Sequence, residues 1–124
     1  MDITPLAPSG AKILQGYGDG GFRISGVRYE GAVLLFPFSV QPWAVSSLTD
    51  ITLESLRPVL EADPKVEILL LGTGTQMELI APALRRDLRK AGVIVDVMDT
   101  GAACRTYSVL MLEGRAIACA LLPA

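Results

Sequence analysis

Eight residues in two short segments have the side chains and backbone groups best suited to chemistry. They are Gly72, Thr73, Gly74, Thr75, Asp99, Thr100, Cys104 and Arg105. Glycine N–H groups and threonine hydroxyls can bind an anion, a carboxylate can move a proton, and a thiol beside an arginine can become a nucleophile. One segment follows the apolar run 66–71, and the other follows the alternating run 93–98. If these runs are parallel strands, both segments lie at the carboxyl edge of one sheet, where open α/β sheets usually place a site.

Each of these residues also has a purely structural interpretation. Glycine and threonine are common turn residues, and no lysine completes a nucleotide-binding P-loop after them. Asp99 or Thr100 is well placed to cap a helix that begins near Ala102. Cys104 falls in the first turn of that helix, where the dipole lowers the pKa of a thiol, but on its apolar side, where burial raises it. We expect burial to prevail, so the eight residues form a candidate binding or contact surface without an assigned catalytic residue.

The composition narrows the chemistry further. The chain has 124 residues, no histidine, and two cysteines, Cys104 and Cys119. Without histidine, the usual Ser-His and Cys-His pairs and histidine metal ligands are excluded, and the cysteine spacing fits no CxxC motif. We therefore expect no metal, no cofactor and no enzymatic activity. A net charge of −2, from 11 basic and 13 acidic residues, argues against nucleic-acid binding.

The same features bear on location. No apolar run approaches the roughly 18 residues of a membrane span, and residues 1–5 lack the basic and apolar regions of a secretory signal. Two unpaired-looking cysteines suit a reducing compartment. We expect a cytoplasmic protein, with peripheral contact at the inner membrane left open.

The pattern along the chain predicts one α/β domain over residues 13–124, preceded by an arm over residues 1–12. Short runs punctuated by glycine predict an antiparallel meander over residues 22–36. A short helix near residues 53–60, capped by Thr52, should follow. Strands at 66–71, 93–98 and 115–122 should then alternate with helices that begin near residues 81 and 102. Trp43 is expected to pack in the core or at its rim.

The segment over residues 77–91, which contains the helix expected to begin near residue 81, has two distinct sides. Its predicted buried stripe consists of Met77, Ile80, Ala81, Leu84, Leu88 and Ala91. The basic side chains fall opposite this stripe and are Arg85, Arg86, Arg89 and Lys90. Such a cluster is typical of a solvated helix face, and a docking role for acidic partners or anionic lipid head groups stays open.

Several stretches of the chain resemble a known family. The more specific ones are Asp99-Thr100 with Ala102-Ala103-Cys104-Arg105-Thr106-Tyr107, and Glu113-Gly114-Arg115; others lie at residues 20–24, 31–35 and 71–74. They resemble small α/β domains of unknown function whose relatives include the mitochondrial respiratory complex I (NADH dehydrogenase) assembly factor 3 and the adipogenesis-associated domain protein. The resemblance implies a three-layer fold around a mixed, mostly parallel sheet whose last strand runs antiparallel to the rest.

The resemblance also implies a role in assembly through protein contacts, with no catalytic residue to carry over. Our first hypothesis is a non-enzymatic assembly-factor or adaptor domain of a bacterial kind, with respiratory complex assembly components among its candidate partners. The rival is a small-molecule or anion-binding domain at residues 72–75 and 99–105, with a thiol step at Cys104. A third hypothesis is that the loops are only structural and that the interface lies elsewhere, for instance on the meander. The partner, the ligand and the oligomeric state stay open.

Overall fold

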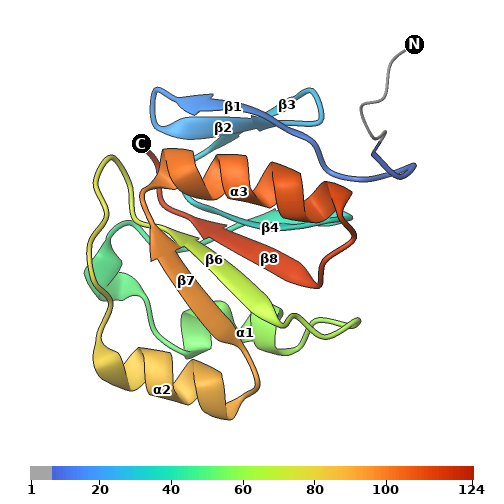
Figure 1. The fold of residues 1–124 in the computed structure, drawn as a ribbon. Coiled ribbons are helices and arrows are strands. Elements are labelled where there is room, and N and C mark those ends of the chain that lie inside the picture. Colours follow the sequence, from blue (N-terminus) through green and yellow to red (C-terminus); the bar gives the residue numbers. More distant parts are fainter. Residues whose placement is uncertain (1–6) are drawn as a thin grey trace.

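The computed structural model describes residues 7–124, so residues 1–6 of the predicted arm lie outside the described part. A five-stranded sheet in the order β5-β4-β8-β6-β7 forms the centre (Figure 1). Its strands are β4 (Val33–Phe36), β5 (Ser39–Pro42), β6 (Ile68–Gly72), β7 (Ile94–Met98) and β8 (Ile117–Leu121). In the described part of the arm, the Lys12 N–H donates to Pro37 O at 2.7 Å, and the Lys12 carbonyl accepts from the Tyr107 hydroxyl at 2.9 Å.

The strand directions confirm a mixed sheet and correct one detail. β6 pairs parallel with both β7 and β8, whereas β4 pairs antiparallel with both β5 and β8. Four strands therefore run one way and β4 alone runs the other, so the expectation that the last strand is the antiparallel one is wrong. The helix between β7 and β8 returns the chain to the starting end of the sheet, and such a crossover produces a parallel strand.

The meander is shorter than predicted. β1 (Leu14–Gly18), β2 (Gly21–Ile24) and β3 (Val27–Glu30) form a separate antiparallel sheet. The next run, which we also assigned to the meander, is β4 of the central sheet. Val33, Leu34 and Leu35 are at most 1% exposed, and a continuous apolar run needs cover on both faces, which only a central strand receives.

Two layers cover the central sheet, as the three-layer prediction requires (Figure 1). α3 (Thr100–Leu112) and the three-stranded sheet pack on one face. The other face is covered by the 3-10 turns Leu48–Asp50 and Glu54–Leu56, α1 (Arg57–Leu60) and α2 (Pro82–Lys90). The alternation of β8 is as predicted, since Ile117, Cys119 and Leu121 face α3 while the small Ala118 and Ala120 face the α2 side.

The helix after β6 begins at Pro82, which confirms the late start. Leu84 and Leu88 are buried against the sheet as predicted. Met77 is 54% exposed, and Ala81 and Ala91 are also exposed, so these three members of the predicted stripe are wrong. Met77 and Ala81 lie in the loop over residues 73–81, where a helical period has no meaning, and Ala91 is the C-cap that follows the last residue of α2.

The predicted cap and the tryptophan lie in the segment between β5 and α1. The Ser55 N–H donates to Thr52 Oγ1 at 3.1 Å, but Leu53 is the N-cap of the 3-10 turn and Leu56 that of α1, so the prediction of one helix capped by Thr52 is wrong. Trp43 is 6% exposed, and its Nε1–H donates to Ser55 O at 2.8 Å. The indole is thus a core anchor with its one polar group paired, as buried tryptophan requires.

Candidate functional site: a braced loop edge

The two predicted segments lie side by side at the carboxyl edge of the sheet. β6 and β7 are parallel neighbours, with Gly72 opposite Met98, which confirms the predicted crossover through α2. Beyond the strands, the Thr73 N–H donates to Met98 O at 2.9 Å, and the Thr100 N–H donates to Gly74 O at 2.8 Å. The end of β8 joins them, because the Leu122 N–H donates to Gly72 O at 2.9 Å.

One side chain ties these segments together. The hydroxyl of Thr100, a residue that is 0% exposed, accepts from the Gly74 N–H at 2.8 Å and donates to Leu122 O at 2.6 Å. It links the loop after β6, the first turn of α3 and the end of β8. We call this pair of bonds the Thr100 brace. Its donor and acceptor capacity is directed at the protein itself rather than at a ligand.

Thr73 plays a similar part inside the loop. Its side chain is buried, and Oγ1 donates to Gln76 O at 2.6 Å while it accepts from the Glu78 N–H at 3.2 Å. These contacts fold residues 73–78 into a compact turn. Thr75, the other threonine of the predicted site, is exposed at the outer side of this turn.

Glycine is required where α3 passes over the end of β6. A Cβ at Gly72 would lie 2.9 Å from both Thr100 Oγ1 and Leu121 Cδ2, closer than side chains tolerate. Gly74 has φ +104°, in the left-handed region where glycine is favoured. Both glycines therefore have a packing or backbone reason to be present.

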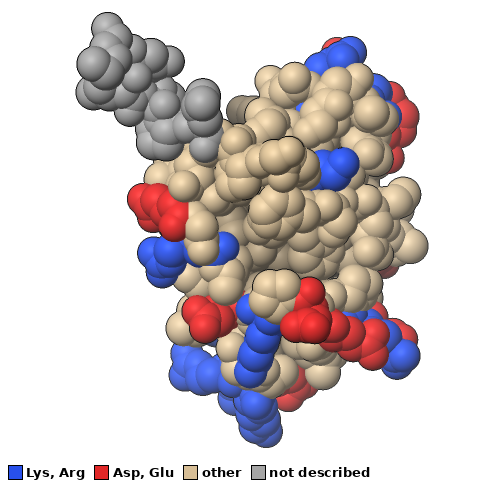
Figure 2. Space-filling model, turned by 90° about the vertical axis from the view of Figure 1, so that its right-hand side faces the viewer, with Lys and Arg blue, Asp and Glu red and all other residues tan. Residues whose placement is uncertain are grey.

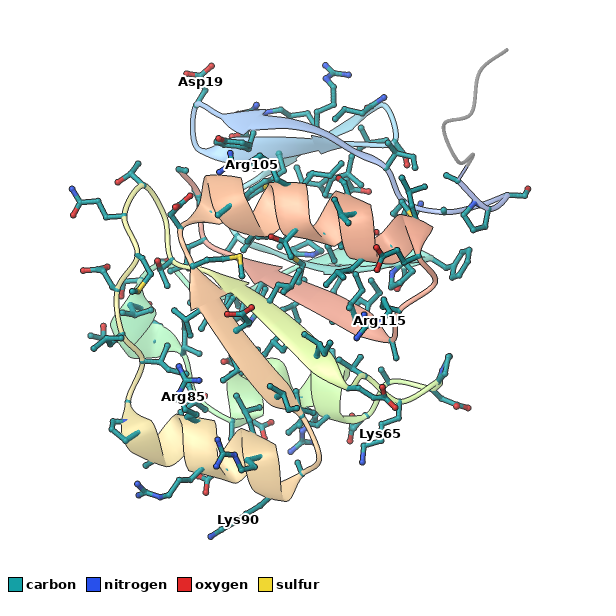
Figure 3. The ribbon with its side chains drawn as sticks, viewed as in Figure 1. Asp19, Lys65, Arg85, Lys90, Arg105 and Arg115 are labelled. Carbon is teal, nitrogen blue, oxygen red and sulfur yellow. The ribbon has the colours of Figure 1, made fainter. Side chains whose placement is uncertain are left out.

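Asp99 is the N-cap of α3, as predicted. Its Oδ1 accepts from the Ala102 N–H at 2.9 Å, which satisfies one of the free donors at a helix start. Arg105 is exposed and lies on the first half of α3, next to the three-stranded sheet (Figure 3). The edge thus exposes Thr75 and Arg105, leaves Asp99 half-buried, and buries Thr73 and Thr100.

Burial prevails at Cys104, in agreement with our expectation. The residue is 6% exposed, and burial raises the pKa of its thiol from an ordinary 9.0 to about 12, against a smaller lowering effect of Arg105. Burial likewise raises the pKa of Cys119 well above its ordinary value. Burial thus favours the protonated form of both thiols near neutral pH.

The structure has one hollow at the far end of the sheet and another beside the loop after β6, and only the second was indicated by a pattern in the sequence. The larger, about 640 Å³, lies at the opposite end of the sheet and is mostly apolar, with Phe36, Phe38 and Met111 in its walls and Lys65 and Arg115 beside them. Figure 2 faces this side and shows a broad uncharged surface with charges around its margin; Figure 3 shows both cations there. No motif or spacing in the sequence indicated it.

The smaller hollow, about 300 Å³, lies between the loop after β6 and α2. Its walls are Leu79, Ile80, Pro82, Arg85, Arg86 and Arg89. The basic cluster was visible in the sequence, but the apolar partner Leu79 was not expected. Within residues 7–124, no three His, Cys, Asp or Glu side chains could hold a metal ion, and no helix is long and apolar enough to cross a membrane.

Fold and edge together define the class: a small three-layer α/β domain whose sheet edge is closed by hydrogen bonds. The chain belongs to the family described as protein of unknown function (DUF498/DUF598), whose model matches residues 14–122. The family resemblance inferred from the sequence is thereby confirmed.

Named relatives and solved structures agree with this membership. The chain is 39% identical over 113 residues to NADH dehydrogenase (ubiquinone) 1 alpha subcomplex assembly factor 3 of Bos taurus, over 91% of this chain and 61% of the relative. It therefore spans about three fifths of that protein. A crystal structure of a Bordetella parapertussis protein has a TM-score of 0.85 and 39% identity, covering 94% of this chain and all of that one. A Mth938-like domain of Bordetella pertussis, solved in solution, has a TM-score of 0.81 and 33% identity, covering 99% and 92%.

Proposed function

We propose that this chain is a non-enzymatic assembly-factor or adaptor domain that acts by docking on another protein. The observation that carries the proposal is the closed loop edge, where a reaction site would be expected in this class of sheet. There the Thr73 hydroxyl donates to Gln76 O within its own loop, and the Thr100 hydroxyl accepts from the Gly74 N–H and donates to Leu122 O. Burial raises the pKa of the Cys104 thiol and so favours its protonated form. The name of the bovine relative, an assembly factor, supports the same role.

The contact surface that we propose includes the exposed part of this edge. Thr75 and Arg105 belong to the predicted site and face solvent. In the same loop as Thr75, Met77 is 54% and Leu79 is 77% exposed. Large apolar side chains held outward on a braced loop are suited to burial against a partner.

The proposed partners are proteins, with assembly components of respiratory complex I as the first candidates because the relatives carry that name. A cytoplasmic location with peripheral membrane contact is part of the same proposal. The rival function, anion binding at residues 72–75 and 99–105, has less support. Its main backbone donor, the Gly74 N–H, is already directed at Thr100 Oγ1 at 2.8 Å.

Deletion of the gene in the native organism tests the assembly role. We expect less fully assembled NADH dehydrogenase on native gels, with subcomplexes accumulating, and rescue by both the wild type and the Cys104→Ala variant. Normal assembly in the deletion strain would refute the role in this complex. Rescue by the wild type alone, with Cys104→Ala folded, would favour the thiol-dependent rival.

A further inference from the structure

The outer face of α2 carries four cations whose placement helix stability does not fully explain. Arg89 and Lys90 lie in the last turn, where the helix dipole favours positive charge. Arg85 and Arg86 are the fourth and fifth of the nine residues of the helix, outside its last turn, so the dipole gives these cations little benefit. Arg85 donates to Val95 O of β7, so Arg86 is the cation that calls for another explanation.

The α2 cations are also not neutralised by the protein's own carboxylates. Residues 7–124 form three ion pairs, and all of them lie on other elements. Two acids are nearby in the sequence, Glu78 in the preceding loop and Asp87 on α2, and both are exposed. Neither comes within ion-pair distance of an α2 arginine. A chain with a net charge of −2 thus keeps a local cationic surface without an internal partner.

These arginines border a hollow that apolar side chains also line. The roughly 300 Å³ space is lined by apolar Leu79, Ile80 and Pro82 together with Arg85, Arg86 and Arg89. The Arg85 Nη1–H donates to Val95 O at 3.2 Å, which holds that side chain against the edge strand β7. Leu79 is 77% exposed although Ile80 beside it is 8% exposed.

We propose that this hollow binds a short acidic and apolar segment of the partner protein. Carboxylates of the segment pair with Arg86 and Arg89, and an adjacent apolar side chain packs on Leu79. Arginine suits this role because its planar fork binds carboxylates with two hydrogen bonds. The inference rests on the proposed docking function and adds the chemistry of the partner.

The shape of the site favours a protein segment over a lipid surface. The hollow is concave and about the size that one or two side chains fill, whereas a membrane contacts a flat or convex basic face. Asp87 lies among these cations and weakens their attraction to a uniformly anionic surface such as a membrane. The carboxylates of a protein segment can still pair with individual arginines.

The test selects peptides from a phage library of random 12-residue sequences on the full chain and measures binding of the synthesised winners by fluorescence anisotropy. We expect winners that carry Asp or Glu beside Leu, Ile, Met or Phe. The double variant Arg86→Glu/Arg89→Glu should weaken binding by at least about tenfold, since two attractive pairs become repulsive. Leu79→Ser should weaken it as well.

A matched control keeps the charge change but moves it to the opposite end of the sheet. Lys65→Glu/Arg115→Glu alters the net charge equally and should leave the affinity unchanged. A peptide with Lys in place of its acidic residues should regain affinity for Arg86→Glu/Arg89→Glu. All these positions are exposed, and circular dichroism melts check that each variant folds.

Equal losses in the two double variants would overturn the inference, because the effect would then be general electrostatics. Winners without acidic residues would do the same. Binding to phosphatidylcholine–phosphatidylglycerol vesicles that depends on Arg86 and Arg89, without peptide binding, would assign the face to lipid and also overturn it. Failure of the selection alongside a deletion strain that loses assembled complex would reject this site and leave the assembly role standing.

Discussion

Replacing Thr100 with valine removes the Thr100 brace while keeping the shape of the side chain. The two groups that lose their partner are the Gly74 N–H, now 2.8 Å from Oγ1, and the Leu122 carbonyl, now 2.6 Å from it. Thr100 is 0% exposed, so water cannot take the place of the hydroxyl. Each buried group left without a partner costs about 1–3 kcal/mol, and valine leaves no cavity. We expect Thr100→Val to lower the free energy of unfolding by about 2–6 kcal/mol.

Urea denaturation followed by circular dichroism measures this loss, and amide hydrogen exchange at Gly74 reports on the brace directly. Thr100→Ser is the control, since it keeps the hydroxyl and loses one buried methyl group, a cost of about 1 kcal/mol. The Gly74 amide should exchange much faster in Thr100→Val than in Thr100→Ser. If Thr100→Val unfolds within about 0.5 kcal/mol of the wild type, the brace does not stabilise the fold and the reasoning is refuted.

Three further predictions concern packing and the thiol. Leu84→Ala should cost about 2–5 kcal/mol in denaturant melts because Leu84 is buried against the sheet, whereas exposed Arg86→Ala should cost less than about 0.5 kcal/mol; equal effects would refute the assigned helix face. Gly72→Ala should cost about 1–3 kcal/mol, since the added Cβ would crowd Thr100 and Leu121, and a neutral result in the same melts would contradict that crowding. Cys104 should react slowly with a thiol probe in the native state, because burial raises its pKa from 9.0 to about 12. The folded state then holds a proton that the unfolded state releases, so this contribution to stability is full below pH 9 and is lost as the pH rises toward 12; fast native labelling near pH 8 would contradict it.

Local patterns in the sequence predicted the parts of the site that depend on neighbours in the chain. Asp99 caps α3 through a residue three positions away, and such capping follows from residue type and position alone. The parallel pair β6 and β7 follows from strand–helix–strand order. The burial of Cys104 follows from its place on the apolar side of α3.

The features that we missed depend on residues far apart in the sequence. Thr100 bonds to Leu122 and to Gly74, across 22 and 26 positions, and no local period encodes such pairs. The insertion of β8 between β4 and β6 likewise depends on which strands meet in space. Met77 was wrongly predicted to be buried, because the spacing of apolar residues is the same whether the segment is a helix or a loop. The hydrogen bonds of the Thr73 side chain, which fold this segment into a turn, leave no local pattern in the sequence.

The brace and the exposed loop belong to one arrangement. The loop after β6 is fixed at its start by Thr73 and Gly74, through bonds to Met98 and Thr100, and at its end by Ile80, which is 8% exposed. Between these fixed ends, the exposed residues have little freedom to lose when a partner binds, and a rigid loop costs less entropy to dock than a mobile one. The buried hydroxyls therefore serve the proposed docking function indirectly: they touch no partner, but they hold Leu79 beside the arginines of α2.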